Sequence, residues 1–159
     1  MSMFILTIEL VPKTSWYSNM RKVMNSQEWD ILRKEVYAKY NHHCGICNDP
    51  GMLHCHEIWN YDDENHIQTL QGFIALCVMC HHVKHIGYAN ILAGRGELDM
   101  QNVINHFVRV NQCPLTDYTK QHMEAFDKWE ERSQFVWNID LGEYNYLKEK
   151  TKCLKILSE

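Results

Sequence analysis

Hydrophobic and polar side chains alternate along the first part of the chain. Phe4, Leu6, Ile8 and Leu10 fall on one side, with a threonine and a glutamate on the other. Alternation with a period of two is typical of a half-buried strand. Residues 135–141 repeat this pattern. We therefore expect two strands that pair and so join the two ends of the chain in a short sheet.

Apolar residues recur every three or four positions in three other segments, as on the buried face of a helix. These segments begin near Ser26, Asp99 and Thr116. Each of these side chains can accept a hydrogen bond from the first turn of a helix and so cap it. Together with the two alternating segments, the helices predict a small, mainly helical α+β domain.

The composition is that of a folded domain of ordinary size. The chain has 159 residues, of which 45% are hydrophobic and 23% are charged, a balance typical of soluble globular proteins. The longest apolar run, Phe73–Cys80, is too short to cross a bilayer. The first ten residues lack the basic segment and cleavage site of a signal peptide. We expect a single domain over residues 1–159, cytoplasmic and without a membrane partner.

Cysteine and histidine residues concentrate in the middle of the chain. Residues 41–90 contain eight of the ten histidines and five of the seven cysteines. An odd cysteine count without a secretion signal argues against a disulfide framework and favours metal binding. We therefore divide the domain into an N-terminal strand and helix (1–40), a metal-binding finger (41–92) and C-terminal helices with a strand (93–159). The net charge of −4 does not indicate nucleic-acid binding by itself.

Two CxxC pairs are the strongest signal in the sequence. Cys44 and Cys47 form the first pair, and Cys77 and Cys80 form the second. A CxxC turn places two thiolates on one side, and two such turns supply the tetrahedral sulfur set that Zn²⁺ prefers. We predict a structural Zn²⁺ held by these four residues. The remaining cysteines are expected to be ordinary core or surface residues (Cys55, Cys113 and Cys153).

Histidines next to the second CxxC pair have the spacing of another metal or phosphate site. His81 and His85 lie on one face if a helix starts near Cys80. His56 lies in an alternating segment upstream and can complete a three-histidine metal site from across the intervening loop. Nitrogen ligands favour Mn²⁺, Ni²⁺, Co²⁺ or Zn²⁺ over Mg²⁺ as the second divalent ion. The other histidines outside this region are expected to be structural, hydrogen-bonded residues (His42, His43, His66, His106 and His122).

At these residues the chain resembles the HNH endonucleases. The resemblance covers about residues 44–88 and includes the two CxxC knuckles, the segment LHCHEIW and the segment LCVMCHHVKH. It implies a ββα-metal zinc finger, embedded here in a small mainly helical domain. The upstream segment TIELVPKTSWYSN is similar to stand-alone bacterial and phage HNH proteins, which extends the likeness over residues 7–92.

The resemblance also implies roles for individual residues. It identifies the four CxxC cysteines as the zinc knuckles and His56, with the two helix histidines, as ligands of the catalytic metal. The position after His56 is the general-base histidine of the family and is Glu57 here, while the position of the central asparagine is Gly72. Glu57 either acts as the base or orients a ligand histidine. His54, two residues before His56, is the alternative base.

The function implied by the resemblance is metal-dependent hydrolysis of phosphodiester bonds in DNA. Lys84 beside the metal face, together with Arg33 and Lys34 in the N-terminal helix, are the candidate contacts to the nucleic acid. Two other interpretations stay open. One is a catalytically impaired HNH-fold zinc module that binds a protein or nucleic-acid partner, with the acidic loop 62–64 as its interaction surface. The other is a transcription-type zinc ribbon.

Overall fold

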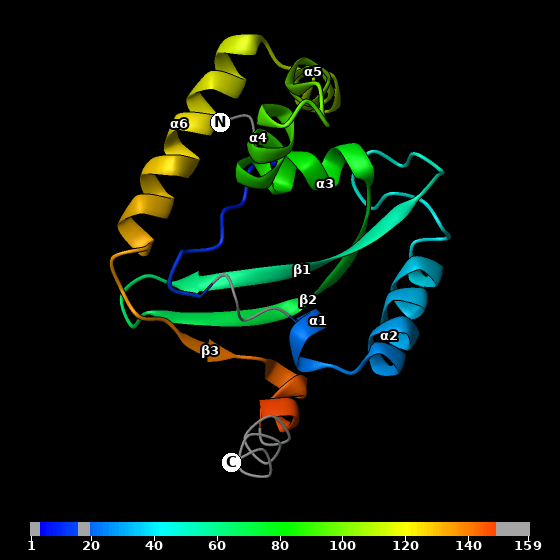
Figure 1. Cartoon of the computed structure of the whole chain (residues 1–159), viewed down its shortest axis with the longest axis vertical. Helices are drawn as coiled ribbons and strands as arrows, with labels where there is room; N and C mark the ends of the chain where they lie inside the picture. The colour runs from blue at the N-terminus through cyan, green and yellow to red at the C-terminus, as the bar shows by residue number, and fades with distance from the viewer. Residues whose placement is uncertain (1–3, 16–19, 149–159) are drawn as a thin grey trace.

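The computed structural model describes residues 4–15 and 20–148 and has a mixed α+β fold with one small sheet (Figure 1). No helix in these two ranges is both long and apolar enough to cross a bilayer. The elements in chain order are α1 (Met20–Val23), α2 (Ser26–Lys39), β1 (Leu53–Asp62), β2 (Ile67–Cys77), α3 (Val78–Lys84), α4 (Ile86–Gly94), α5 (Met100–Asn111), α6 (Leu115–Arg132), β3 (Asn138–Asp140) and the 3₁₀ helix η1 (Gly142–Tyr144).

The sheet is built around the β1–β2 hairpin. The two strands are antiparallel, and β3 lies parallel to β2 on its other side, so the strand order is β1-β2-β3. The register of the hairpin shifts between Ile58 and Trp59. Gly72 pairs with Ile58 at this irregularity and has a φ of 150°, which side chains rarely allow. A glycine at this position therefore follows from the backbone of the hairpin.

Each face of the hairpin packs against a separate hydrophobic core. On one face, α3, α4, α5 and α6 gather around side chains such as Leu76, Val83 and Phe107. On the other face, α2 and the segment around η1 pack through side chains such as Leu32 and Leu141. Figure 1 shows the hairpin between these two groups of helices. β1 is an edge strand, so its outer edge lies open between the two layers.

The predicted pairing of the two terminal strands is wrong. Residues 4–10 form no strand, and β3, within the predicted segment 135–141, pairs with β2 instead. The alternation still reflects burial, because Leu6 and Ile8 are both buried in the core beneath α3, α5 and α6. The short sheet therefore does not join the two ends of the chain as we expected.

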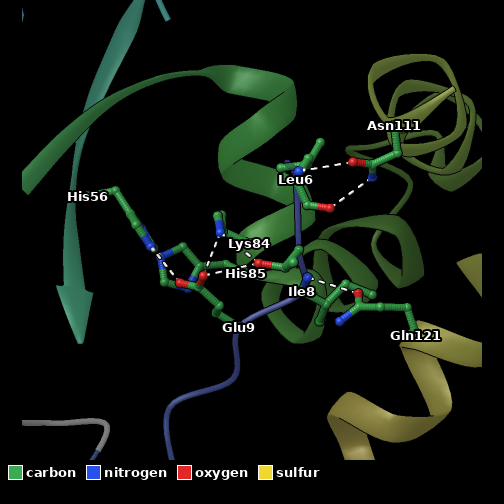
Figure 2. A network of polar contacts seen from close by, with 9 residues as sticks. Leu6, Ile8, Glu9, His56, Lys84, His85, Asn111 and Gln121 are labelled. Atoms are coloured by element: carbon green, nitrogen blue, oxygen red, sulfur yellow. Dashed lines mark hydrogen bonds and ion pairs between the residues drawn. The ribbon is translucent and has the colours of Figure 1, made fainter. Parts of the chain in front are cut away.

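Side-chain amides take the place of a neighbouring strand along residues 4–10. The Asn111 side chain accepts a hydrogen bond from the Leu6 N–H at 3.0 Å and donates one to the Leu6 carbonyl at 2.8 Å. The Gln121 side chain accepts from the Ile8 N–H at 2.9 Å (Figure 2). Buried backbone groups need partners of some kind, and here α5 and α6 supply them without a sheet.

The three predicted helices are present as α2, α5 and α6. Asp99 caps α5 as predicted. The other two starts differ slightly: Asn25 rather than Ser26 caps α2, in a capping box with Glu28, and α6 begins one residue before Thr116. The periodic pattern therefore located the helices, although not each capping residue.

Candidate metal centres

The loop before β1, the β1–β2 hairpin and α3 bring the predicted metal ligands together along one short helix. Cys77 ends β2 and caps α3, where its sulfur accepts a hydrogen bond from the Cys80 N–H at 3.3 Å. His81 lies one turn further along, and His85 caps the other end of α3. The hairpin and helix together have the ββα arrangement expected from the sequence, and two separate ligand groups lie along it.

The four CxxC cysteines form the first group, here called the cysteine cluster. The sulfurs of Cys44, Cys47, Cys77 and Cys80 all lie within 4.8 Å of one another. Cys47 is the only one of the four that is not buried. The knuckle that carries the first pair is tight, because a Cβ on Gly45 would lie only 2.7 Å from the Tyr40 ring. The cluster can hold a metal ion, and it has the composition of a structural zinc site.

The charges of this cluster also fit a dication. Hydrogen bonds from the thiols of Cys77 and Cys80 lower the pKa of Cys44, so that this residue carries the negative charge of the group. Burial, reinforced by contact with the neighbouring sulfurs of Cys77 and Cys44, raises the pKa of Cys47 to about 12. Four sulfurs at this separation can ionise together only when a cation offsets their repulsion.

His106 adds a hydrogen bond to this cluster from outside. Its Nε2 lies 3.1 Å from the Cys80 sulfur, and its Nδ1 lies 3.0 Å from Nη2 of Arg109. A guanidinium group only donates, so Nδ1 accepts and the proton of the neutral ring is on Nε2, facing the sulfur. Burial, followed by the nearby Arg109 charge, lowers the pKa of His106, which keeps the ring neutral. The sequence indicated a structural histidine here but not its cysteine partner.

His56, His81 and His85 form the second group, the histidine cluster. One ring nitrogen of each lies within 4.8 Å of those of the other two. The His56 Nδ1 is 3.1 Å from the His85 Nε2, and the ring planes of His81 and His85 are nearly perpendicular. The predicted spacing therefore holds in space, with one histidine from β1 and two from α3 and its cap.

The environment of His81 and His85 suits the histidine cluster to bind a metal ion. Burial, reinforced by the other histidines, lowers the pKa of His81 to about 2 and that of His85 to about 4. At neutral pH these imidazoles keep the lone pairs that a metal requires. Two imidazole nitrogens 3.1 Å apart are also placed to share one ion without rearrangement of the backbone. The donor set favours a transition metal over Mg²⁺.

The two candidate bases lie on opposite faces of β1. The His54 ring stacks on the His81 ring, with the centroids 4.7 Å apart and the planes 8° from parallel. The Glu57 carboxylate instead accepts a hydrogen bond from the Met20 N–H at 2.7 Å, at the start of α1. Burial raises the pKa of Glu57. The structure brings His54 to the histidine cluster and directs the Glu57 carboxylate elsewhere.

The three predicted nucleic-acid contacts have different surroundings. Lys84 is buried, and its ammonium group lies 2.5 Å from Oε1 of Glu9 and 3.0 Å from the Thr7 hydroxyl. It is therefore not on the exposed surface where a phosphate contact was expected. Arg33 pairs with Asp30 on the surface of α2 at 2.7 Å, and Lys34 beside it is exposed.

The histidine cluster opens into a cleft of about 1080 Å³ along the open edge of β1. The cysteine cluster does not contribute to the walls of this cleft. Basic side chains from the N-terminal part of the chain line it, including Arg21 and Arg33. Aromatic side chains from α2, β1, α4 and α6 form much of the rest (Trp29, Tyr37, Trp59, Tyr88, Phe126 and Trp129).

Glu9 is the residue of this site that the sequence did not indicate. Its Oε2 lies 3.6 Å from the His56 Nε2, and its Oε1 pairs with Lys84 (Figure 2). Although partial burial raises the pKa of Glu9, the contacts with His56 and Lys84 lower it to about 2. The alternating pattern had placed this carboxylate on the polar side of a strand, which gave no signal of its partners.

Comparison with known proteins adds no further information on the two clusters, because no protein-family model, curated protein or solved structure matches the chain. The resemblance to HNH endonucleases therefore rests on the motifs themselves.

Proposed function

We propose that this chain is a metal-dependent endonuclease of the HNH type that hydrolyses phosphodiester bonds in DNA. The observation that carries the proposal is the presence of two ligand groups on one ββα unit. The cysteine cluster alone would suffice to stabilise a binding module. The histidine cluster lies beside a large cleft, as expected of a site that must admit a substrate.

In this proposal the two clusters have different tasks. The cysteine cluster holds a structural Zn²⁺ and so fixes α3 against the hairpin. His56, His81 and His85 hold a second divalent ion beside the cleft. That ion, when bound, acts as a Lewis acid that stabilises the charge developing on the scissile phosphate. The three histidines orient the site and leave one side of it open to the cleft.

His54 is the best candidate to accept the proton of the attacking water. It lies on the same face of β1 as His56 and stacks on His81. Burial lowers its pKa, so the ring is neutral and able to accept a proton at neutral pH. Glu57 occupies the base position by resemblance, but its carboxylate is engaged by the Met20 N–H. This hydrogen bond occupies one carboxylate oxygen and orients Glu57 towards the start of α1.

The DNA backbone would pass along the cleft beside α2. Arg21 and Arg33 line the cleft, and Lys34 is exposed on the same helix as Arg33. Few positive charges are available and the net charge is −4. We therefore expect modest affinity that falls as the salt concentration rises.

Cleavage of supercoiled plasmid tests the proposal. The wild-type protein should nick DNA with Mn²⁺, Ni²⁺, Co²⁺ or Zn²⁺, and more weakly with Mg²⁺, because the proposed site offers nitrogen ligands. His81→Ala should lower the rate by about 100-fold or more while the protein stays folded. His122→Ala is a matched control, since His122 belongs to neither cluster, and it should cleave like the wild type.

Two further variants separate the candidate bases. His54→Ala should lower the cleavage rate by about 100-fold with metal binding retained, and Glu57→Gln should have the smaller effect. The reverse order would make Glu57 the base. A wild-type protein that cleaves neither double-stranded nor single-stranded DNA with any of these metals would contradict the nuclease proposal.

A non-catalytic zinc module is the second candidate. The hydrogen bond that engages Glu57, together with glycine at position 72, favours this interpretation, because both positions depart from the HNH pattern. The acidic loop offers little support as a docking surface. Asp62 accepts hydrogen bonds within its own turn, and Asp63 forms a two-pronged ion pair with Arg132. Binding of a partner without any cleavage would favour the module.

A further inference from the structure

Glu9 reaches the histidine cluster from a distant part of the sequence. It belongs to the extended segment that α5 and α6 hold through side-chain amides, and its own N–H donates to the Lys84 carbonyl at 3.1 Å. The Glu9 carboxylate consequently lies against the end of α3, beside His56 (Figure 2). Its side chain is 48% exposed, because it lies in the wall of the cleft.

The two nitrogens of His56 face different neighbours. Nδ1 lies 3.1 Å from the His85 Nε2, on the side of the other ligand histidines. Nε2 is buried and has no hydrogen-bond partner among the described residues. Oε2 of Glu9 lies 3.6 Å from this nitrogen. A buried ring nitrogen without a partner is costly, and a shift of a few tenths of an ångström would give it one.

Lys84 holds the carboxylate in this position. Its ammonium group lies 2.5 Å from Oε1 of Glu9 and 3.0 Å from the Thr7 hydroxyl, which itself donates to Oε1 at 3.1 Å. The Lys84 side chain is only 9% exposed, so this pairing is stronger than an ordinary surface ion pair. One carboxylate oxygen is therefore held by Lys84 and Thr7, and the other is left to face His56.

We propose that Glu9 is a positioning residue for the histidine cluster: it accepts a hydrogen bond from Nε2–H of His56 and so directs the bare Nδ1 towards the metal. A metal-bound histidine commonly donates its other N–H to a carboxylate, which fixes the tautomer and makes the ligand more basic. Glu9 acts through His56 in this arrangement and does not itself bind the ion. The inference rests on metal binding at the histidine cluster, as in the proposed function.

Metal titration of protein that already carries zinc in its cysteine cluster tests this role. Co²⁺ is added to the wild type, Glu9→Gln and Glu9→Asp, and the dissociation constant is measured from the cobalt absorption bands. Glu9→Gln should bind Co²⁺ about 10- to 100-fold more weakly than the wild type, with Glu9→Asp between them. Asp63→Asn is the matched control, because it removes another ion-paired carboxylate that belongs to neither cluster, and it should bind like the wild type.

Nitrogen NMR of the histidine rings gives a second readout that does not depend on any variant. In the metal-loaded wild type, His56 should carry a proton on Nε2 and bind metal through Nδ1. This measurement remains decisive if Glu9→Gln fails to fold. Metal bound at Nε2 of His56, or equal Co²⁺ affinity of Glu9→Gln and the wild type, would overturn the positioning role alone. A wild type that binds Co²⁺ nowhere outside the cysteine cluster would overturn both this inference and the proposed function.

Discussion

The cysteine and histidine clusters share α3 but differ in almost every physical respect. Three of the four cysteines are buried, whereas two of the three histidines are only partly buried. Cys77 and Cys80 lie at the start of α3, away from the cleft, and His81 and His85 line it. The cysteines at the start of α3 are therefore mostly enclosed, whereas the histidines further along are accessible from the cleft.

The partners of the two clusters are also opposite in kind. His106 directs an N–H towards a cysteine sulfur, and this donor offsets negative charge on a thiolate. Glu9 directs a carboxylate towards a histidine ring, and in our proposal this acceptor makes the ring a stronger metal ligand. α5 supplies the first partner, and the N-terminal segment supplies the second. Each cluster therefore depends on a part of the chain outside the ββα unit.

The largest expected effect is loss of the cysteine cluster. Cys44→Ser should leave the protein unfolded or aggregated, because a structural Zn²⁺ contributes on the order of 10 kcal/mol to folding in small zinc domains. Circular dichroism and zinc content measure the outcome. Cys113→Ser is the control, since Cys113 lies outside both clusters, and it should melt like the wild type. A soluble, zinc-free Cys44→Ser protein with an unchanged melting curve would show that the cysteine cluster does not stabilise the fold.

Stepwise removal of metal should show, without any mutation, that the two clusters differ in accessibility and in their contribution to stability. A chelator should take the ion from the histidine cluster first, because that cluster opens into the cleft. The melting temperature should change little at that stage. Removal of the more deeply buried zinc should follow more slowly, with collapse of the fold. Metal analysis and thermal melts on the same samples check this order, and simultaneous loss of both ions would contradict it.

His106→Leu should have a smaller effect, confined to one cluster. The substitution removes the donor that faces Cys80 and roughly keeps the volume of the side chain. Zinc affinity should fall by about 10- to 100-fold, as for other partners of metal ligands. Competition with a coloured zinc chelator measures this change. Cobalt binding at the histidine cluster should be unaffected, and an equal loss at both clusters would mean that the substitution disturbs the whole fold.

The smallest expected effect lies away from both clusters. Asp63→Asn should cost about 0.5–1 kcal/mol of unfolding free energy, because its partly exposed pair with Arg132 is screened by solvent. Arg132 lowers the pKa of Asp63 from its usual value of 3.8. The contribution of the pair is therefore present above pH 3.8 and disappears as the pH falls through the lower, folded-state pKa. Urea denaturation at neutral pH measures the loss of unfolding free energy, and the same experiment at acidic pH measures how this loss depends on pH.

Local spacing accounts for what the sequence predicted well. Each CxxC pair spans a single turn, and His81 and His85 are four residues apart, so backbone geometry alone brings them close. His56 was grouped with them because the alternation along β1 predicted that His54 and His56 lie on the same face of the strand. The three long helices were also located from periodicity, since one face of each is packed: α2 against the hairpin, α5 against α3 and α6 against α5.

The amino-acid sequence by itself thus determined the two candidate ligand sets and the ββα unit that carries them. Tertiary structure alone decided which groups support those ligands. Residues 4–10 had the pattern of a strand, but Asn111 and Gln121 satisfy their backbone instead of another strand. As a result Glu9 reaches His56 across 47 positions of sequence, and His106 reaches Cys80 across 26. No periodic pattern encodes such contacts, because they depend on how separate elements pack in space.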